Sequence, residues 1–210
     1  MRAHVLATGL LTAAVCSAPA AAQTDDQALS QQLANPVADL ISIPIQFNYD
    51  QNLGADEEGT RTVLNFQPVV PVSLNDDWNL ISRTIIPVVW TDGLPAGAGR
   101  ESGLGDVAQS FFFSPKLTTA SGLTWGVGPA LLLPTATETQ FGTEKFGGGP
   151  TGVVLQRSGP WTVGGLANHL VSVAGASGRA DVNATYLQPF IVYSTQNAWN
   201  FALNSESTYN

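Results

Sequence analysis

Alternation of apolar and polar residues dominates the chain from Ile41 onward. In the stretch ISIPIQFNY, residues 41–49, apolar side chains occupy every second position, and Ser42, Gln46 and Asn48 lie between them. A period of two places successive side chains on opposite faces of a β-strand. The stretch therefore predicts a strand with one apolar face and one polar face.

Eight further segments show the same alternation, and turn-forming residues separate them. Their predicted ranges are 62–74, 77–90, 107–117, 124–134, 151–157, 161–172, 182–193 and 199–209. The segments between them alternate in length, because 91–106 is long whereas 75–77 and 118–122 are short. Long loops at one end and short turns at the other are typical of outer-membrane barrels. The pattern favours an all-β fold, an antiparallel β-barrel over residues 41–210.

The segment 77–90, DWNLISRTIIPVVW, carries the membrane prediction. Trp78 and Trp90 share one face, twelve positions apart (90 minus 78), and Arg83 lies on the other. At about 3.3 Å per residue and a tilt near 45°, that separation is roughly 28 Å along a membrane normal. Aromatic girdles flank an apolar band about 25 Å tall in such barrels. We therefore expect Trp78 and Trp90 at the two membrane interfaces and Arg83 in the lumen.

The last predicted strand repeats this arrangement, with Trp199 and Tyr209 on one face and Glu206 on the other. A charge at the lipid midplane costs about 2–4 kcal/mol. Glu206 and Arg157 are therefore expected to face the lumen with Arg83. Eight prolines lie within or at the ends of the predicted strands, and we expect them at rims, bulges or lumen-facing irregularities. They are Pro44, Pro68, Pro71, Pro87, Pro115, Pro129, Pro134 and Pro189.

Composition supports an exported protein. Charged residues make up 11% of the chain, against about 25% in ordinary soluble proteins. Residues 1–22 combine a basic start at Arg2, an apolar run and a small-residue end, which predicts a secretory signal peptide. The only cysteine, Cys16, lies within it. The net charge of −8 argues against nucleic acid as a partner. Outer membrane is the expected location.

Residues 23–40 predict a short helical lead-in to the barrel. Leu29 and Leu33 are spaced by one helical turn, and Pro36 stops the pattern near Asn35. Such a segment could plug the barrel or act as a periplasmic arm. A loosely packed lead-in is the favoured interpretation.

Several blocks together resemble one bacterial family. They are NPVADLISIPIQFNYD, LNFQPVVPVSLNDDWNLISRTIIPVV, SGLGDVAQSFFFSPK, WGVGPALLLPTAT, GGGPTGVVL, WTVGGLANHLVSVAG and YLQPFIVY. In this order they resemble the MetA-pathway of phenol degradation family, whose members are often named transporters or neuromedin U. The resemblance implies an outer-membrane β-barrel that moves small hydrophobic or aromatic compounds. It implies outer-membrane lipid and the barrel assembly machinery as partners, and neither catalytic residues nor a cofactor.

The resemblance also predicts that part of the barrel is missing. Family members continue beyond a block like NSESTY and end on an aromatic residue, whereas this sequence stops at Asn210. Nine strands are an odd number, and single-chain bacterial barrels usually have an even number. The expected whole is a barrel of about 12 strands, of which this chain lacks the C-terminal part.

Two other functions remain open at this point. A secreted, soluble β-sandwich with a ligand-binding or adhesive role would share the alternation. An outer-membrane lipid hydrolase would need His169 as a base beside a nucleophile such as Ser172. Period two places these residues on opposite faces of one strand, and we expect no enzyme.

Other candidate chemistry is weaker. A single histidine after residue 22 argues against a His-rich metal site. The glycine-rich SGLGD and FGGGP lack phosphate-binding spacing. Phe112 could stack on a ligand, although packing is the stronger expectation. The acidic residues 56–58 could bind a divalent cation, but they are expected in a solvated loop.

Overall fold

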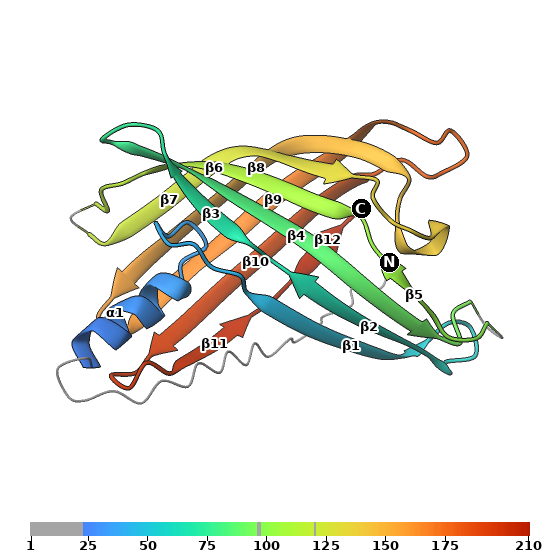
Figure 1. Cartoon of the computed structure of the whole chain (residues 1–210), viewed down its shortest axis with the longest axis horizontal. Coiled ribbons are helices and arrows are strands. Elements are labelled where there is room, and N and C mark those ends of the chain that lie inside the picture. Colours follow the sequence, from blue (N-terminus) through green and yellow to red (C-terminus); the bar gives the residue numbers. More distant parts are fainter. Residues whose placement is uncertain (1–22, 96–97, 120) are drawn as a thin grey trace.

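The computed structural model describes residues 23–95, 98–119 and 121–210. The predicted signal peptide, residues 1–22, lies outside the described residues. The described residues form one antiparallel sheet that curls into a half-barrel, with the helix α1 at one end (Figure 1). This confirms the all-β, antiparallel prediction. No helix in the described part of the chain is long and apolar enough to cross a membrane.

The elements follow one another along the chain in simple order. They are α1 (Gln23–Leu33), β1 (Ile45–Leu53), β2 (Gly59–Phe66), β3 (Val69–Ser73), β4 (Trp78–Asp92), β5 (Glu101–Leu104), β6 (Val107–Pro115), β7 (Leu123–Leu133), the 3-10 helix η1 (Thr139–Phe141), β8 (Lys145–Ser158), β9 (Trp161–Gly175), β10 (Asn183–Ser194), β11 (Asn200–Asn204) and β12 (Ser207–Tyr209).

Neighbours in the sheet are neighbours in the sequence. The main path is β1-β2-β4-β6-β7-β8-β9-β10-β11. The three remaining strands extend this path: β3 continues β2 along β4, β5 precedes β6 along β4, and β12 continues β11 along β10. β1 and β11 are the two ends of the path. A meander of this kind needs only hairpin connections.

The main path contains nine strands, at the positions where alternation predicts them. Several boundaries differ: β1 covers residues 45–53 instead of 41–49, β2 begins at Gly59 instead of residue 62, and the predicted strands 62–74 and 199–209 are each divided into two. β5 lies inside the segment 91–106, which was expected to be a loop throughout. β8 begins at Lys145 instead of residue 151, because the glycines 147–149 pair with β7 although they carry no alternating side chains.

The two ends of the sheet differ in their connections. At one end lie the segments 74–77, 116–122, 159–160 and 195–199, which we call the short-turn end. Gly159 has a positive φ of 57° there, which suits the tight turn between β8 and β9. At the other end lie the segments 54–58, 93–100, 134–144 and 176–182, which we call the long-loop end. Figure 1 places α1 at the short-turn end.

The prolines are only partly where they were expected. Pro44, Pro68 and Pro134 lie just outside strands, and Pro115 ends β6. The other four expected prolines are inside strands, at Pro71, Pro87, Pro129 and Pro189. Pro87 lies where β4 changes its partner from β6 to β5, and Pro189 lies beside the break between β11 and β12. Pro129 pairs with Pro150 on the convex face, so the expectation of lumen-facing positions is wrong for Pro129.

The two faces of the sheet differ in how far their side chains are exposed. On the convex face the large apolar side chains are exposed, among them Ile45, Phe47, Val72, Val127, Val163 and Leu203. On the concave face, side chains of distant strands meet one another. Their contacts form the candidate site.

Candidate functional site

An apolar layer fills the concave side towards the short-turn end. Phe112 of β6 and Ile81 of β4 are fully buried there. They pack with side chains from the other strands and from the lead-in segment: Val37, Val69, Val153 and Leu166, with Tyr186 against them. Phe112 is therefore a core residue. This agrees with the expectation that Phe112 serves packing and not ligand stacking.

A chain of polar side chains lies next to this layer. Arg83 of β4 donates from Nη2 to Oε1 of Gln67 at 2.6 Å. Gln67 in turn donates from Nε2 to Oε1 of Gln46 at 2.7 Å. Gln46 and Gln67 are buried, and buried amides need such partners because an unpaired polar group costs about 1–3 kcal/mol.

Glu206 receives the far end of this chain. Its Oε1 accepts hydrogen bonds from Nε2 of Gln46 at 3.3 Å, Nε2 of Gln188 at 3.1 Å and Nδ2 of Asn204 at 3.2 Å. Gln46 belongs to β1 and Glu206 lies between β11 and β12. The polar chain therefore links the two ends of the sheet path across the concave side.

The structure thus brings together two of the charged residues that the sequence singled out. Arg83 and Glu206 lie on the concave face and are joined through Gln67 and Gln46. Two opposite charges joined by amides in a partly buried site stabilise one another more than they would in water. That this face borders a lumen stays a prediction.

The lead-in helix is held against the same concave face. Ser30 of α1 is buried and donates to Oδ1 of Asn200 at 2.7 Å, and Nδ2 of Asn200 donates back to the Ser30 carbonyl at 2.8 Å. Gln31 donates to the Gly159 carbonyl at 3.3 Å. Arg157 donates from Nη2 to the Gln31 carbonyl at 3.2 Å, so Arg157 lies with the helix and apart from Arg83.

The helix packs through a polar side instead of its leucines. Leu29 and Leu33, which are spaced by one helical turn, remain 46% and 47% exposed. Val37, just beyond the helix, supplies the buried apolar contact. A small cavity of about 180 Å³ remains between this segment and the wall, with buried Asn79 and Ser114 among its lining residues.

Aromatic side chains gather near both ends of the convex face. At the short-turn end Trp78 meets Trp125 edge-to-face with ring centroids 5.9 Å apart, and Trp161 meets Tyr193 at 4.8 Å. Trp199 is 57% exposed at the same end. The long-loop end of β4 carries exposed Trp90, and exposed Tyr209 lies on β12 opposite Thr185 of β10.

Two polar groups on the convex face have polar partners on neighbouring strands. Gln109 accepts a hydrogen bond from Thr84 at 2.6 Å and donates to Ser82 at 3.0 Å, in the middle of β4 and β6. His169 lies 2.9 Å from Thr185. Pairing satisfies these side chains within an apolar surface, where an unpaired polar group is costly. Cross-strand pairs of this kind become visible only once the register is known.

The structure does not pair His169 with Ser172. Ser172 lies on the opposite face and donates to Asp181 at 3.2 Å. Among the described residues, no group of three or more His, Cys, Asp or Glu side chains could hold a metal ion. Of the acidic residues 56–58, Asp56 accepts a hydrogen bond from the Glu58 amide within its own exposed loop.

Searches of family models, curated proteins and solved structures found no match to this chain.

Proposed function

We propose that the chain is an outer-membrane β-barrel protein that moves small solutes across the membrane. The observation that carries this proposal is the exposed apolar surface of the convex face. The convex face exposes large aliphatic and aromatic side chains, whereas the concave face collects the buried amides and the Arg83–Glu206 chain. Lipid outside and polar groups inside is the pattern of membrane barrels.

The alternative of a soluble β-sandwich fits this surface less well. A sandwich buries the apolar face of each sheet against a second sheet. In this chain large apolar side chains of the convex face stay exposed, with Phe47 at 61% and Leu203 at 69% exposure, in addition to the apolar layer buried on the concave side. Soluble monomers rarely expose large contiguous apolar patches. A lipid environment removes that difficulty.

The concave side supports passage that is gated instead of permanently open. The apolar layer around Phe112 and the polar chain from Arg83 to Glu206 occupy the interior, and α1 covers the short-turn end. Movement of α1 with Val37 would remove one wall of the apolar layer. The family resemblance suggests small hydrophobic or aromatic molecules as the solutes.

Two measurements test this function. The full chain, expressed in Gram-negative cells, is expected in the outer-membrane fraction with heat-modifiable gel mobility. Purified chain in vesicles with lipopolysaccharide in the outer leaflet should speed the entry of nitrobenzene, read as quenching of an enclosed dye. Recovery in the soluble periplasm, or quenching no faster than in protein-free vesicles, would contradict the proposal.

A further inference from the structure

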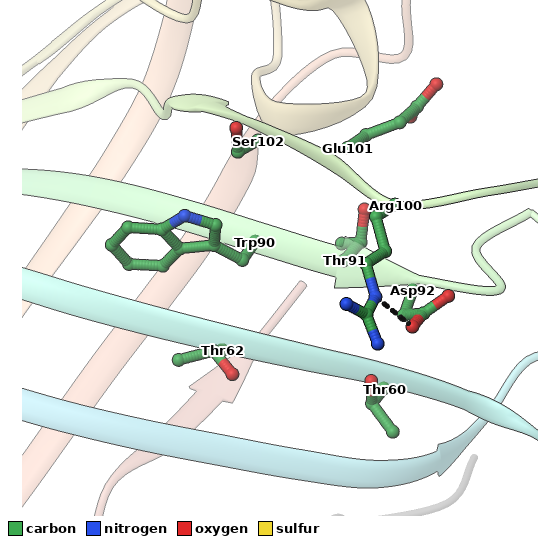
Figure 2. Close-up of a pocket in the computed structure, with 8 residues that line it drawn as sticks. All are labelled: Thr60, Thr62, Trp90, Thr91, Asp92, Arg100, Glu101 and Ser102. Carbon is green, nitrogen blue, oxygen red and sulfur yellow. Dashed lines mark hydrogen bonds and ion pairs between the residues drawn. The ribbon is translucent and has the colours of Figure 1, made fainter.

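A second hollow lies on the convex face, away from the concave site. It has a volume of about 300 Å³ and lies at the long-loop end, over β2, β4 and β5 (Figure 2). Its lining includes one aromatic ring, Trp90, together with Thr60, Thr62, Ser102, Asp92 and Arg100. Clefts with an aromatic wall and a few polar groups are typical of small-ligand sites.

The strand register leaves the indole of Trp90 open. Thr62 of β2 and Ser102 of β5 are the cross-strand partners of Trp90, so all three side chains share one face. Figure 2 shows the ring lying along β4 between these two short side chains. Trp90 is 42% exposed as a result. A flat aromatic surface is thus bordered by a hydroxyl on each side.

A charged pair forms the rim of the hollow. Arg100 donates from Nε to Oδ2 of Asp92 at 2.8 Å. Figure 2 shows the guanidinium reaching across β4 towards Thr60, the cross-strand partner of Asp92. The guanidinium has further N–H donors at its two Nη atoms, and the carboxylate has a second oxygen acceptor. The rim can therefore both donate and accept hydrogen bonds.

We propose that this hollow binds an uncharged pyranose ring, from a glycolipid headgroup or from a free oligosaccharide. A pyranose presents a face of C–H groups that packs on an indole, and a rim of hydroxyls that donate and accept. Both features match the Trp90 face and the rim around it.

Two other ligand classes fit less well. A wholly apolar aromatic molecule would leave the hydroxyls and charges of the rim without partners. Asp92 and Glu101 against Arg100 give the lining a formal charge of −1 (two minus one), which disfavours phosphorylated or acidic sugars. The proposal rests on the proposed function in one respect: the long-loop end would then face the saccharide layer of the outer leaflet.

Fluorine NMR of the full chain labelled with 5-fluorotryptophan tests the site. Trp90→Phe assigns the Trp90 resonance, and Trp161, at the opposite end of the convex face, is the internal control. Titration uses maltohexaose for the free sugar, and nanodiscs with or without the uncharged glycolipid digalactosyldiacylglycerol for the glycolipid headgroup. A saturable shift of the Trp90 resonance alone supports the site, and the arm that produces it identifies the source.

Two variants test whether the residues of the hollow determine the binding affinity. Thr62→Val keeps the shape of the side chain and removes its hydroxyl, and it should weaken binding several-fold. Trp161→Phe should leave the affinity unchanged. No saturable Trp90 shift in either arm, or equal shifts at Trp90 and Trp161, would overturn the site. Correct membrane insertion without binding refutes the site alone, whereas binding by a chain that stays soluble refutes the proposed function alone.

Discussion

Glu206 gathers three amide donors, from Gln46, Gln188 and Asn204, on one carboxylate oxygen. Replacing it with alanine would remove this acceptor from Gln188 and Asn204 and would leave Gln46 with Asn48 as its remaining acceptor. An unpaired buried donor costs about 1–3 kcal/mol. We expect Glu206→Ala to lower the free energy of unfolding by about that amount. The urea midpoint of the heat-modifiable band measures the change.

Glu206→Gln is the matched control for this prediction. Glutamine keeps an oxygen acceptor at the same place but loses the charge opposite Arg83, so its loss of stability should be smaller. Equal midpoints for Glu206→Ala and the unchanged chain would show that the network contributes nothing to stability.

Asp181, in the connection between β9 and β10, gives a prediction about pH. The hydrogen bond from Lys145 at 2.9 Å, the positive charge of Lys145, and the hydroxyl of Ser172 lower the pKa of Asp181 below its ordinary value near 3.8. A carboxylate with a depressed folded-state pKa stabilises above its unfolded pKa, and the contribution is lost as pH falls through the folded pKa.

Asp181→Asn should therefore lower the thermal midpoint by the same small amount at about pH 7 and at about pH 5. The difference from the unchanged chain should shrink below about pH 4. Calorimetry in detergent follows both proteins across this range. A difference that grows as the pH falls would contradict the assignment of this ion pair.

At the scale of the elements, β4 contains two neighbouring isoleucines that lie on opposite faces of the sheet. Ile86 lies on the convex face beside Phe66, and Ile85 lies on the concave face beside Ala108. An arginine facing lipid near the midplane costs about 2–4 kcal/mol, whereas one facing a polar interior costs less. Ile86→Arg should thus impair membrane assembly more than Ile85→Arg, measured as the heat-modifiable fraction. Equal assembly of both variants would contradict the face assignment of β4.

Helix α1 can be tested as a gate by tethering it. Ser30 and Asn200 are in direct hydrogen-bond contact, and Cys16 is the only native cysteine. With residues 1–22 absent, the double variant Ser30→Cys, Asn200→Cys should form a disulfide that slows nitrobenzene entry into vesicles several-fold. Reduction should restore the rate. The control is the single variant Ser30→Cys, which cannot form this disulfide. If nitrobenzene enters the oxidised double variant at the unchanged rate, α1 does not act as a gate.

Strand positions were predictable because alternation is a local signal. In β1 the side chains of Phe47 and Asn48 already differ in polarity, and the structure places them on opposite faces. The start of β8 was missed because its glycines carry no side-chain pattern, and β5 was missed because it is short. Contacts between distant segments, such as Ser30 with Asn200, depend on the curvature of the sheet, which no local pattern encodes.

At the scale of the whole molecule, the proposed function requires the convex face to contact lipid. Several polar side chains on the concave face pair across the sheet, as the Gln46–Glu206 hydrogen bond illustrates. The convex apolar side chains have no such partners among the described residues and are exposed. A bilayer supplies an apolar environment for that face and leaves the polar groups inside.

Spin labels on adjacent residues of one strand test this claim most directly. Cysteine at Phe47 places a label on the convex face, and cysteine at Asn48 places one on the concave face. In vesicles, collision with oxygen reports lipid and collision with a water-soluble nickel chelate reports water. The account predicts that the label at 47 collides mainly with oxygen and the label at 48 does not. Ready access of the nickel chelate to the label at 47 would contradict the membrane barrel.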